Sequence, residues 1–105
     1  MSKTTPEGAV TRAIRDILDA MDIYHWKVYQ TLGSAPGIAD ILGIYDSRLL
    51  AIEVKAPGKK VKEDSAQQRF LDNVSDRGGI AFEADSIEAL KAGFAKYGYT
   101  LPLLL

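Results

Sequence analysis

The 105-residue sequence contains no cysteine and a single histidine, His25. The lack of cysteine excludes a disulfide-stapled scaffold, a thiolate nucleophile and a zinc site built from cysteine ligands. One histidine is too few for a histidine-based metal cage, and it argues against a Ser-His-Asp triad, so we expect His25 to be structural or exposed. Any chemistry of this chain therefore has to rely on carboxylates, lysines and amides.

Long apolar runs and an excess of one charge are missing as well. No run is long enough for a membrane span and the amino terminus is polar, so we expect no signal peptide, no membrane association and a location in the cytoplasm of a bacterial or phage-infected host cell. Hydrophobic residues make up 47% and charged residues 26%, which is typical of one globular domain over residues 1–105. The net charge of −1 argues against a protein that coats nucleic acid by bulk charge.

The first part of the sequence predicts an amphipathic helix. Apolar residues recur at spacings of three and four from Ala9 to Met21, and Thr4 and Thr5 before Pro6 provide an N-cap and a favourable first turn. Glu7 lies on the same stripe as the apolar residues. It can complete a Thr-x-x-Glu capping box with Thr4, or it can contribute to a functional site, and the pattern leaves both roles open.

The remaining patterns predict four strands and two more helices. The last helix is expected to begin with a capping box formed by Asp85 and Glu88 and to end at Gly98. The resulting order is α-β-β-β-α-β-α, an α/β domain with a mixed (α+β) sheet. The expected strands are 23–31, 38–45, 48–55 and 80–84, and the middle helix runs from a cap at Asp64 or Ser65 to Gly78-Gly79.

The hairpin around Asp46-Ser47 brings two carboxylates together. Counting outward from an opposed pair of Tyr45 and Arg48, Asp40 faces Glu53 with Cβ atoms about 4.5–5.5 Å apart. Lys55 lies two residues further along the same face. A bulge at Gly43 would shift this register.

Such a pair requires an explanation, because two carboxylates ~5 Å apart repel by about 3 kcal/mol at an effective dielectric constant of 20. Lys55 can offset part of the repulsion in a purely structural ion pair. A divalent cation explains the pair better, since Mg²⁺ and Mn²⁺ prefer oxygen ligands such as Asp40, Glu53 and the backbone carbonyl of Val54. A metal ion together with Lys55 is suited to the hydrolysis of a phosphodiester bond.

These residues resemble a known nuclease signature. Gly37-Ile-Ala-Asp40 followed by Glu53-Val-Lys55 is similar to the PD-(D/E)xK pattern. Gln67, Phe70-Leu71 and Gly78-Gly79 narrow the resemblance to the virus-type replication-repair nucleases (VRR-NUC), in the short stand-alone form typical of phages and prophages. The likeness covers about Glu7 to Ile87, and it departs from the family at Ala39, where proline is usual.

The resemblance implies a restriction-endonuclease-like PD-(D/E)xK core and assigns roles within it. Asp40 and Glu53 become the ligands of Mg²⁺ or Mn²⁺, and Lys55 becomes the catalytic lysine. Gln67 is implied to reach into the site from its helix, with Gln68 as the competing candidate, and Glu7 to assist there. The implied protein is a homodimer that cuts branched DNA such as four-way (Holliday) junctions.

Basic and aromatic residues outside this pattern have open roles. The loop that carries Lys59, Lys60 and Lys62 is either a solvated turn or a grip on the DNA backbone, which Arg69 and Arg77 would extend. Three aromatic residues, Tyr24, Trp26 and Tyr29, can either stack on bases or cover the sheet. The apolar tail from Tyr99 to Leu105, which includes Leu103 to Leu105, can either fold back onto the core or dock on a second subunit.

Three alternatives to a junction nuclease also remain. One is a restriction-type endonuclease or an exonuclease with the same core, although 105 residues leave little room for a segment that reads sequence. Another is a catalytically silent nucleic-acid-binding module, against which the intact Asp40, Glu53 and Lys55 argue. The last is a protein-interaction subunit that uses the apolar tail.

Overall fold

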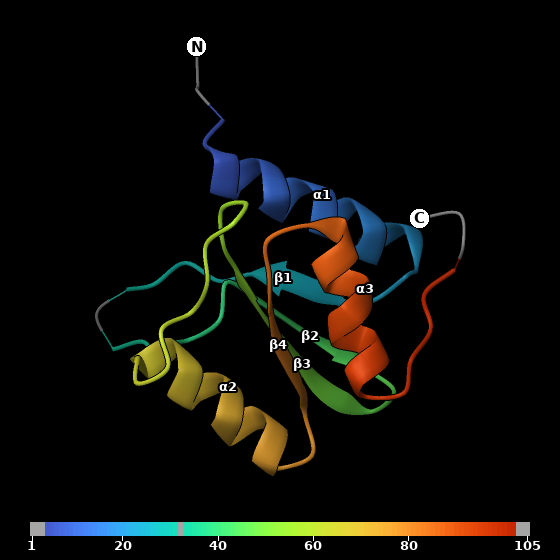
Figure 1. The fold of residues 1–105 in the computed structure, drawn as a ribbon. Coiled ribbons are helices and arrows are strands. Elements are labelled where there is room, and N and C mark those ends of the chain that lie inside the picture. Colours follow the sequence, from blue (N-terminus) through green and yellow to red (C-terminus); the bar gives the residue numbers. More distant parts are fainter. Residues whose placement is uncertain (1–3, 32, 103–105) are drawn as a thin grey trace.

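A four-stranded mixed sheet organises residues 4–31 and 33–102, which are the residues that the computed structural model describes (Figure 1). Together with three helices it forms an α+β domain, as the sequence predicts at this level of detail. The elements in chain order are α1 (Pro6–Ala20), β1 (His25–Lys27), β2 (Ile41–Tyr45), β3 (Arg48–Val54), α2 (Ala66–Asp76), β4 (Ile80–Ala84) and α3 (Ile87–Lys96).

The strands lie in the order β1-β2-β3-β4, antiparallel except for the parallel pair β3–β4. Asp46 and Ser47 have φ values of 53° and 60°, the positive values that a two-residue type I′ hairpin turn requires. Tyr45 pairs with Arg48, so the predicted register is confirmed. Gly43 pairs directly with Leu50, so there is no bulge at Gly43 that would shift the register.

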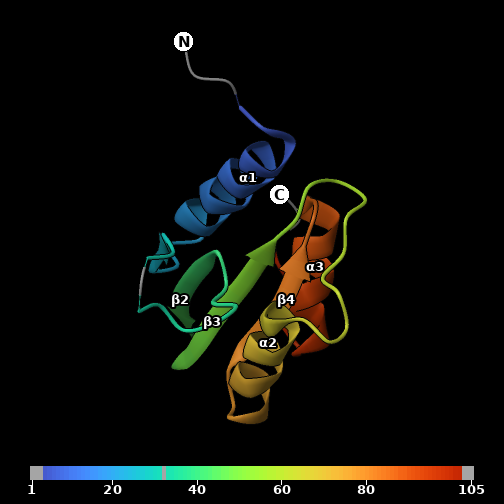
Figure 2. The same cartoon turned by 90° about the vertical axis from the view of Figure 1, so that its left-hand side faces the viewer.

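Helices cover both faces of the sheet. α1 and α3 pack on one face, and α2 lies on the other against β3 and β4 (Figure 2). The larger core lies under α1 and α3, where Ile14 and Phe94 are fully buried against Ile52. The smaller core lies under α2, where Leu71 packs on Ala51 and Ala81. Alternating residues of β3 thus enter different cores, as the period of two in a strand dictates.

Several predicted element ends are wrong by a few residues. β1 covers His25–Lys27 instead of residues 23–31. The N-cap of α1 is Thr5, whose hydroxyl accepts the backbone N–H of Gly8 at 2.9 Å, so the capping box between Thr4 and Glu7 does not form. Ser86, and not Asp85, caps α3. In each case the cap is the residue directly before the first helical residue, because its side-chain oxygen can reach the free N–H groups of the first turn.

The structure describes the apolar tail as far as Pro102, and Leu103 to Leu105 lie outside the described part of the chain. In the described part Leu101 is buried in the larger core and Tyr99 packs against it, so residues 99–101 fold back onto the core. Among residues 4–31 and 33–102, no helix has both the length and the apolar character to cross a membrane.

Candidate active site

Asp40 and Glu53 lie side by side where β2 begins and β3 ends. The register that pairs Ile41 with Ile52 places them one step further along the two strands. The Asp40 carboxylate accepts the backbone N–H of Val54 at 2.7 Å, so it takes the place that a strand carbonyl would otherwise occupy. The backbone N–H of Val28 donates to the Asp40 carbonyl, also at 2.7 Å. Backbone groups on both sides therefore hold Asp40 in position.

Glu53 is an unusual residue for the interior of a sheet. It is only 6% exposed, and its Oε1 atom is buried with no hydrogen-bond partner in the described part of the chain. Burial raises the pKa of Glu53 from 4.5 to about 8, and the neighbouring carboxylate of Asp40 contributes to the same shift. The free protein thus buries a carboxyl group that is mostly protonated at neutral pH.

Lys55 partly compensates for this arrangement. Its Nζ lies 3.7 Å from Oε2 of Glu53, and its side chain is 23% exposed. Its positive charge lowers the pKa of Glu53, although burial and Asp40 outweigh it. The backbone N–H of Lys55 donates to the carbonyl of Ala84 at 3.0 Å and fixes the lysine at the end of the parallel pair. Lys55 therefore presents its ammonium group beside the carboxylate pair, at the margin of the solvent.

The residues present fit a divalent cation with oxygen ligands. The unpartnered Oε1 of Glu53 is a buried lone-pair donor beside the Asp40 carboxylate. The N–H of Val54 points to Asp40, and the N–H and C=O of one strand residue face the same side, so the Val54 carbonyl faces that side too. Among the described residues no group of three or more His, Cys, Asp or Glu side chains could hold a metal ion, so carbonyl and water oxygens would complete the coordination.

Glu7 reaches this site only through its charge. It is exposed at the second position of α1, and its negative charge adds a minor contribution to the raised pKa of Glu53. No hydrogen bond joins its carboxylate to Asp40 or Lys55 in the described residues. Because the capping box is absent, two roles remain for Glu7. Its negative charge can interact favourably with the N-terminus of the helix, and it can act on the nearby site.

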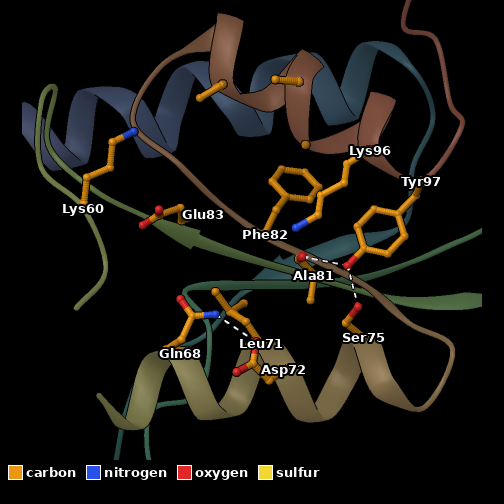
Figure 3. Close-up of a pocket in the computed structure, with 13 residues that line it drawn as sticks. Lys60, Gln68, Leu71, Asp72, Ser75, Ala81, Phe82, Glu83, Lys96 and Tyr97 are labelled. Atoms are coloured by element: carbon orange, nitrogen blue, oxygen red, sulfur yellow. Dashed lines mark hydrogen bonds between the residues drawn. The ribbon is translucent and has the colours of Figure 1, made fainter. Parts of the chain in front are cut away.

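The structure distinguishes between the two glutamines of α2. The side-chain amide of Gln68 donates to Asp72 at 2.9 Å, and it lines a cleft of about 380 Å³ between α2 and α3 that Figure 3 shows in close-up. Gln67 is half-buried in the first turn of α2, and its side chain has no hydrogen-bond partner among the described residues. Gln67 is therefore the glutamine that remains available, although no contact joins it to the carboxylates.

Gly37 joins the loop before Asp40 to the beginning of α2. Its φ is +68°, and an added Cβ would lie 2.2 Å from the carbonyl carbon and oxygen of Ala66 and 2.5 Å from the nitrogen of Gln67. Those are backbone atoms of a helix and cannot move aside. The loop can approach the helix end that carries Gln67 only because residue 37 is glycine.

We expect Gly37→Ala to destabilise the protein by about 2–4 kcal/mol, the sum of backbone strain at positive φ and overpacking. Gly58→Ala is the matched control, because Gly58 has φ +81° but nothing within 4 Å of its added Cβ. It should cost only the strain. Urea unfolding of both variants measures the difference, and equal midpoints would show that the close contact at Gly37 is unimportant.

Two carboxylates accept hydrogen bonds from the backbone of the lysine-rich loop, a role that the sequence did not predict for them. Asp85 accepts the backbone N–H of Gly58 at 2.9 Å, and Glu83 accepts that of Val61 at 2.5 Å. The hydrogen bond from Gly58 lowers the pKa of Asp85, with a further contribution from Lys60. In the sequence, the two acidic residues at alternate positions 83 and 85, at the end of a predicted strand, were the only indication that carboxylates bind this loop. The lysines of this loop, Lys59, Lys60 and Lys62, are all exposed.

No family model, no curated protein and no solved structure matches this chain in the comparisons with known proteins.

Proposed function

We propose that this protein is a metal-dependent, structure-selective DNA endonuclease that hydrolyses phosphodiester bonds, with branched DNA such as the four-way junction as its substrate. The observation that carries the proposal is Glu53, a buried carboxyl group with an unpartnered oxygen, placed between Asp40 and Lys55. A fold that needed only stability has no use for this residue at this position, because a buried, repelled carboxyl group lowers the stability of the sheet.

Asp40, Glu53 and the Val54 carbonyl would hold the Mg²⁺ or Mn²⁺ ion. When bound, such an ion activates water and neutralises charge on a phosphate. The protein supplies the rest of the chemistry. The backbone N–H of Val54 fixes the Asp40 carboxylate, and the rigid end of β3 fixes Glu53 relative to it. This preorganisation means that little rearrangement is needed when the phosphate arrives.

Lys55 would stabilise the charge that develops on the phosphate oxygens. An ammonium group that is partly withdrawn from water exerts a stronger field than one on the open surface. Its present partner is Glu53, 3.7 Å away, and an ionised Glu53 engaged with a cation would leave the lysine free to turn towards the substrate. Gln67, whose side chain has no hydrogen-bond partner among the described residues, and Glu7, whose charge acts on Glu53, would position a water molecule beside the phosphate.

The exposed lysines of the loop after β3 would bind the phosphates of the DNA backbone. Asp85 and Glu83 bind the backbone of this loop, so the loop has a defined course while its side chains remain in solvent. The net charge of −1 is compatible with this contact, because positions 55–62 carry four lysines and no acid. Such contacts position the substrate and make binding depend on salt.

The proposal includes a homodimer, for which one face of the sheet provides a surface. Trp26 pairs with Leu42, and Leu42 pairs with Ala51, so Trp26 lies on the α2 side of the sheet. α2 packs mainly on β3 and β4, and four large apolar side chains on this side are exposed. They are Tyr24, Trp26, Ile44 and Leu49. Aromatic residues of this kind are enriched in interfaces, and a two-fold dimer suits a two-fold substrate. Native mass measurement tests this part.

A cleavage assay tests the proposed function. Labelled four-way junction, flap, linear duplex and supercoiled plasmid are incubated with Mg²⁺, with Mn²⁺ or with a chelator, beside the Glu53→Ala variant. We expect metal-dependent cutting of the branched substrates and at least a 100-fold loss in the variant, about the scale of removing one preorganised electrostatic group.

Each other result identifies an alternative. Equal cutting by Glu53→Ala, or cutting in chelator, contradicts the mechanism. Preferential cutting of plasmid or of linear ends indicates a restriction-type enzyme or an exonuclease. Tight junction binding without cutting indicates a silent nucleic-acid-binding module.

A further inference from the structure

A second basic surface lies between α1 and β1, and it is separate from the lysine-rich loop. A groove of about 280 Å³ is lined there by Arg12 and Arg15 of α1 and by Lys27 of β1. Asp16 and Asp19 lie along the same groove. None of these five residues belongs to the nuclease-like pattern of the sequence.

Two of the three cations are available to a ligand. Neither Arg12 nor Lys27 forms an ion pair with an acid in the described part of the chain, although Asp16 and Asp19 are close. Arg15 is engaged, because its Nε donates to Nε2 of His25 at 3.4 Å. The groove therefore contains two cationic groups, Arg12 and Lys27, that form no ion pair with a carboxylate in the described part of the chain.

An aromatic ring extends this surface. Tyr29 is 73% exposed, and Nζ of Lys27 lies 4.5 Å from the centre of its ring. Lys27 and Tyr29 are two residues apart, so they share one side of the chain as it leaves β1. A cation above a solvent-exposed ring provides both an attraction for a phosphate and a flat apolar surface for a base.

The groove adjoins the candidate active site at two points. Val28, between Lys27 and Tyr29, donates its backbone N–H to the carbonyl of Asp40 at 2.7 Å. On the helix, Gly8 lines the groove and directly follows Glu7. Figure 2 shows α1 on one side of the end of β3 and the loop after β3 on the other. Both basic surfaces therefore belong to segments that adjoin the elements carrying the carboxylate pair.

We propose that this groove binds an unpaired segment of the substrate DNA, with Arg12 and Lys27 on its phosphates and Tyr29 stacked on one base. The proposal rests on the nuclease function and names what the enzyme would recognise next to its site. An unpaired strand is favoured over duplex because only an unstacked base can offer its face to Tyr29. An enzyme with this groove prefers junctions and flaps that expose unpaired nucleotides beside the scissile bond.

Binding measured in chelator tests the groove without requiring cleavage. Fluorescence anisotropy compares a single-stranded oligonucleotide, a flap with the same unpaired sequence and a blunt duplex. We expect Tyr29→Ala to weaken binding of the first two about tenfold and to leave the blunt duplex unchanged, the effect of losing one stacked base. Arg12→Gln should reduce the magnitude of the salt dependence for the single strand by about one phosphate contact.

Tyr29→Phe is the matched control, because it keeps the exposed ring beside Lys27 and removes only the hydroxyl group, so it should bind unpaired DNA like the wild type. Equal losses in Tyr29→Phe and Tyr29→Ala, equal losses on blunt duplex, or no binding of unpaired DNA would overturn the proposal. If Tyr29-dependent binding is found in a protein that never cuts, the groove stands and the nuclease function fails. Cutting that is unaffected by Tyr29→Ala and Arg12→Gln, with unchanged single-strand binding, leaves the nuclease and removes the groove.

Discussion

Glu53→Gln is expected to raise the melting temperature of the metal-free protein at pH 8 by about 5–10 °C and to abolish phosphodiester cleavage. The pKa of Glu53 is about 8 in the folded protein against 4.5 for the ordinary side chain. Between these two pH values the folded state binds a proton that the unfolded state does not, so stability falls as pH rises from about 4.5 to 8. A neutral amide of the same shape avoids this loss and removes the repulsion by Asp40. The same change removes an anionic ligand from the site.

The pH dependence separates this explanation from a general effect of the substitution. Below about pH 4 both Glu53 and its unfolded counterpart are largely protonated, so the stability of the variant and of the wild type should converge. Glu63→Gln is the matched control, because Glu63 is exposed and its replacement should change neither stability nor cleavage. A variant that is less stable than wild type at pH 8 would mean that ionised Glu53 is stabilised by its surroundings.

Added Mg²⁺ is expected to stabilise the protein far more at pH 8 than at pH 6. A cation binds the ionised carboxylate, and the raised pKa of Glu53 means that this proton must leave when the ion binds. The apparent affinity should therefore rise about tenfold per pH unit up to pH 8 and level off above it. Because a ligand that binds only the folded state raises its stability, melting temperatures at fixed Mg²⁺ report this affinity directly.

Two measurements make this prediction specific. Titration calorimetry in buffers of different ionisation enthalpy should detect the release of close to one proton per bound ion at pH 6 to 7. Glu53→Gln should lose the Mg²⁺ effect at both pH values. An Mg²⁺ shift that is the same at pH 6 and pH 8, or that survives in Glu53→Gln, would place the ion elsewhere on the protein.

The parts of this fold that could be predicted depend on local chemistry. Asp46 and Ser47 are short polar residues that tolerate positive φ, and an alternating apolar pattern follows them, so the turn and the pairing of Tyr45 with Arg48 were predictable. From that pairing the proximity of Asp40 and Glu53 followed directly. The ends of elements were less predictable. Aromatic and β-branched residues at 28–31 suggested a longer β1, but there the chain leaves the sheet for the loop that leads to Asp40.

The sequence alone determined the α-β-β-β-α-β-α order, the hairpin register and the juxtaposition of Asp40, Glu53 and Lys55, because these depend on residue periodicity and one tight turn. Only the tertiary structure decided how deeply Glu53 is buried and which glutamine remains free. It also showed that Glu83 and Asp85 hold the lysine-rich loop, and that Arg12 meets Lys27 across the groove. Burial and contacts between distant segments arise from how helices pack on a sheet, and no local pattern encodes that packing.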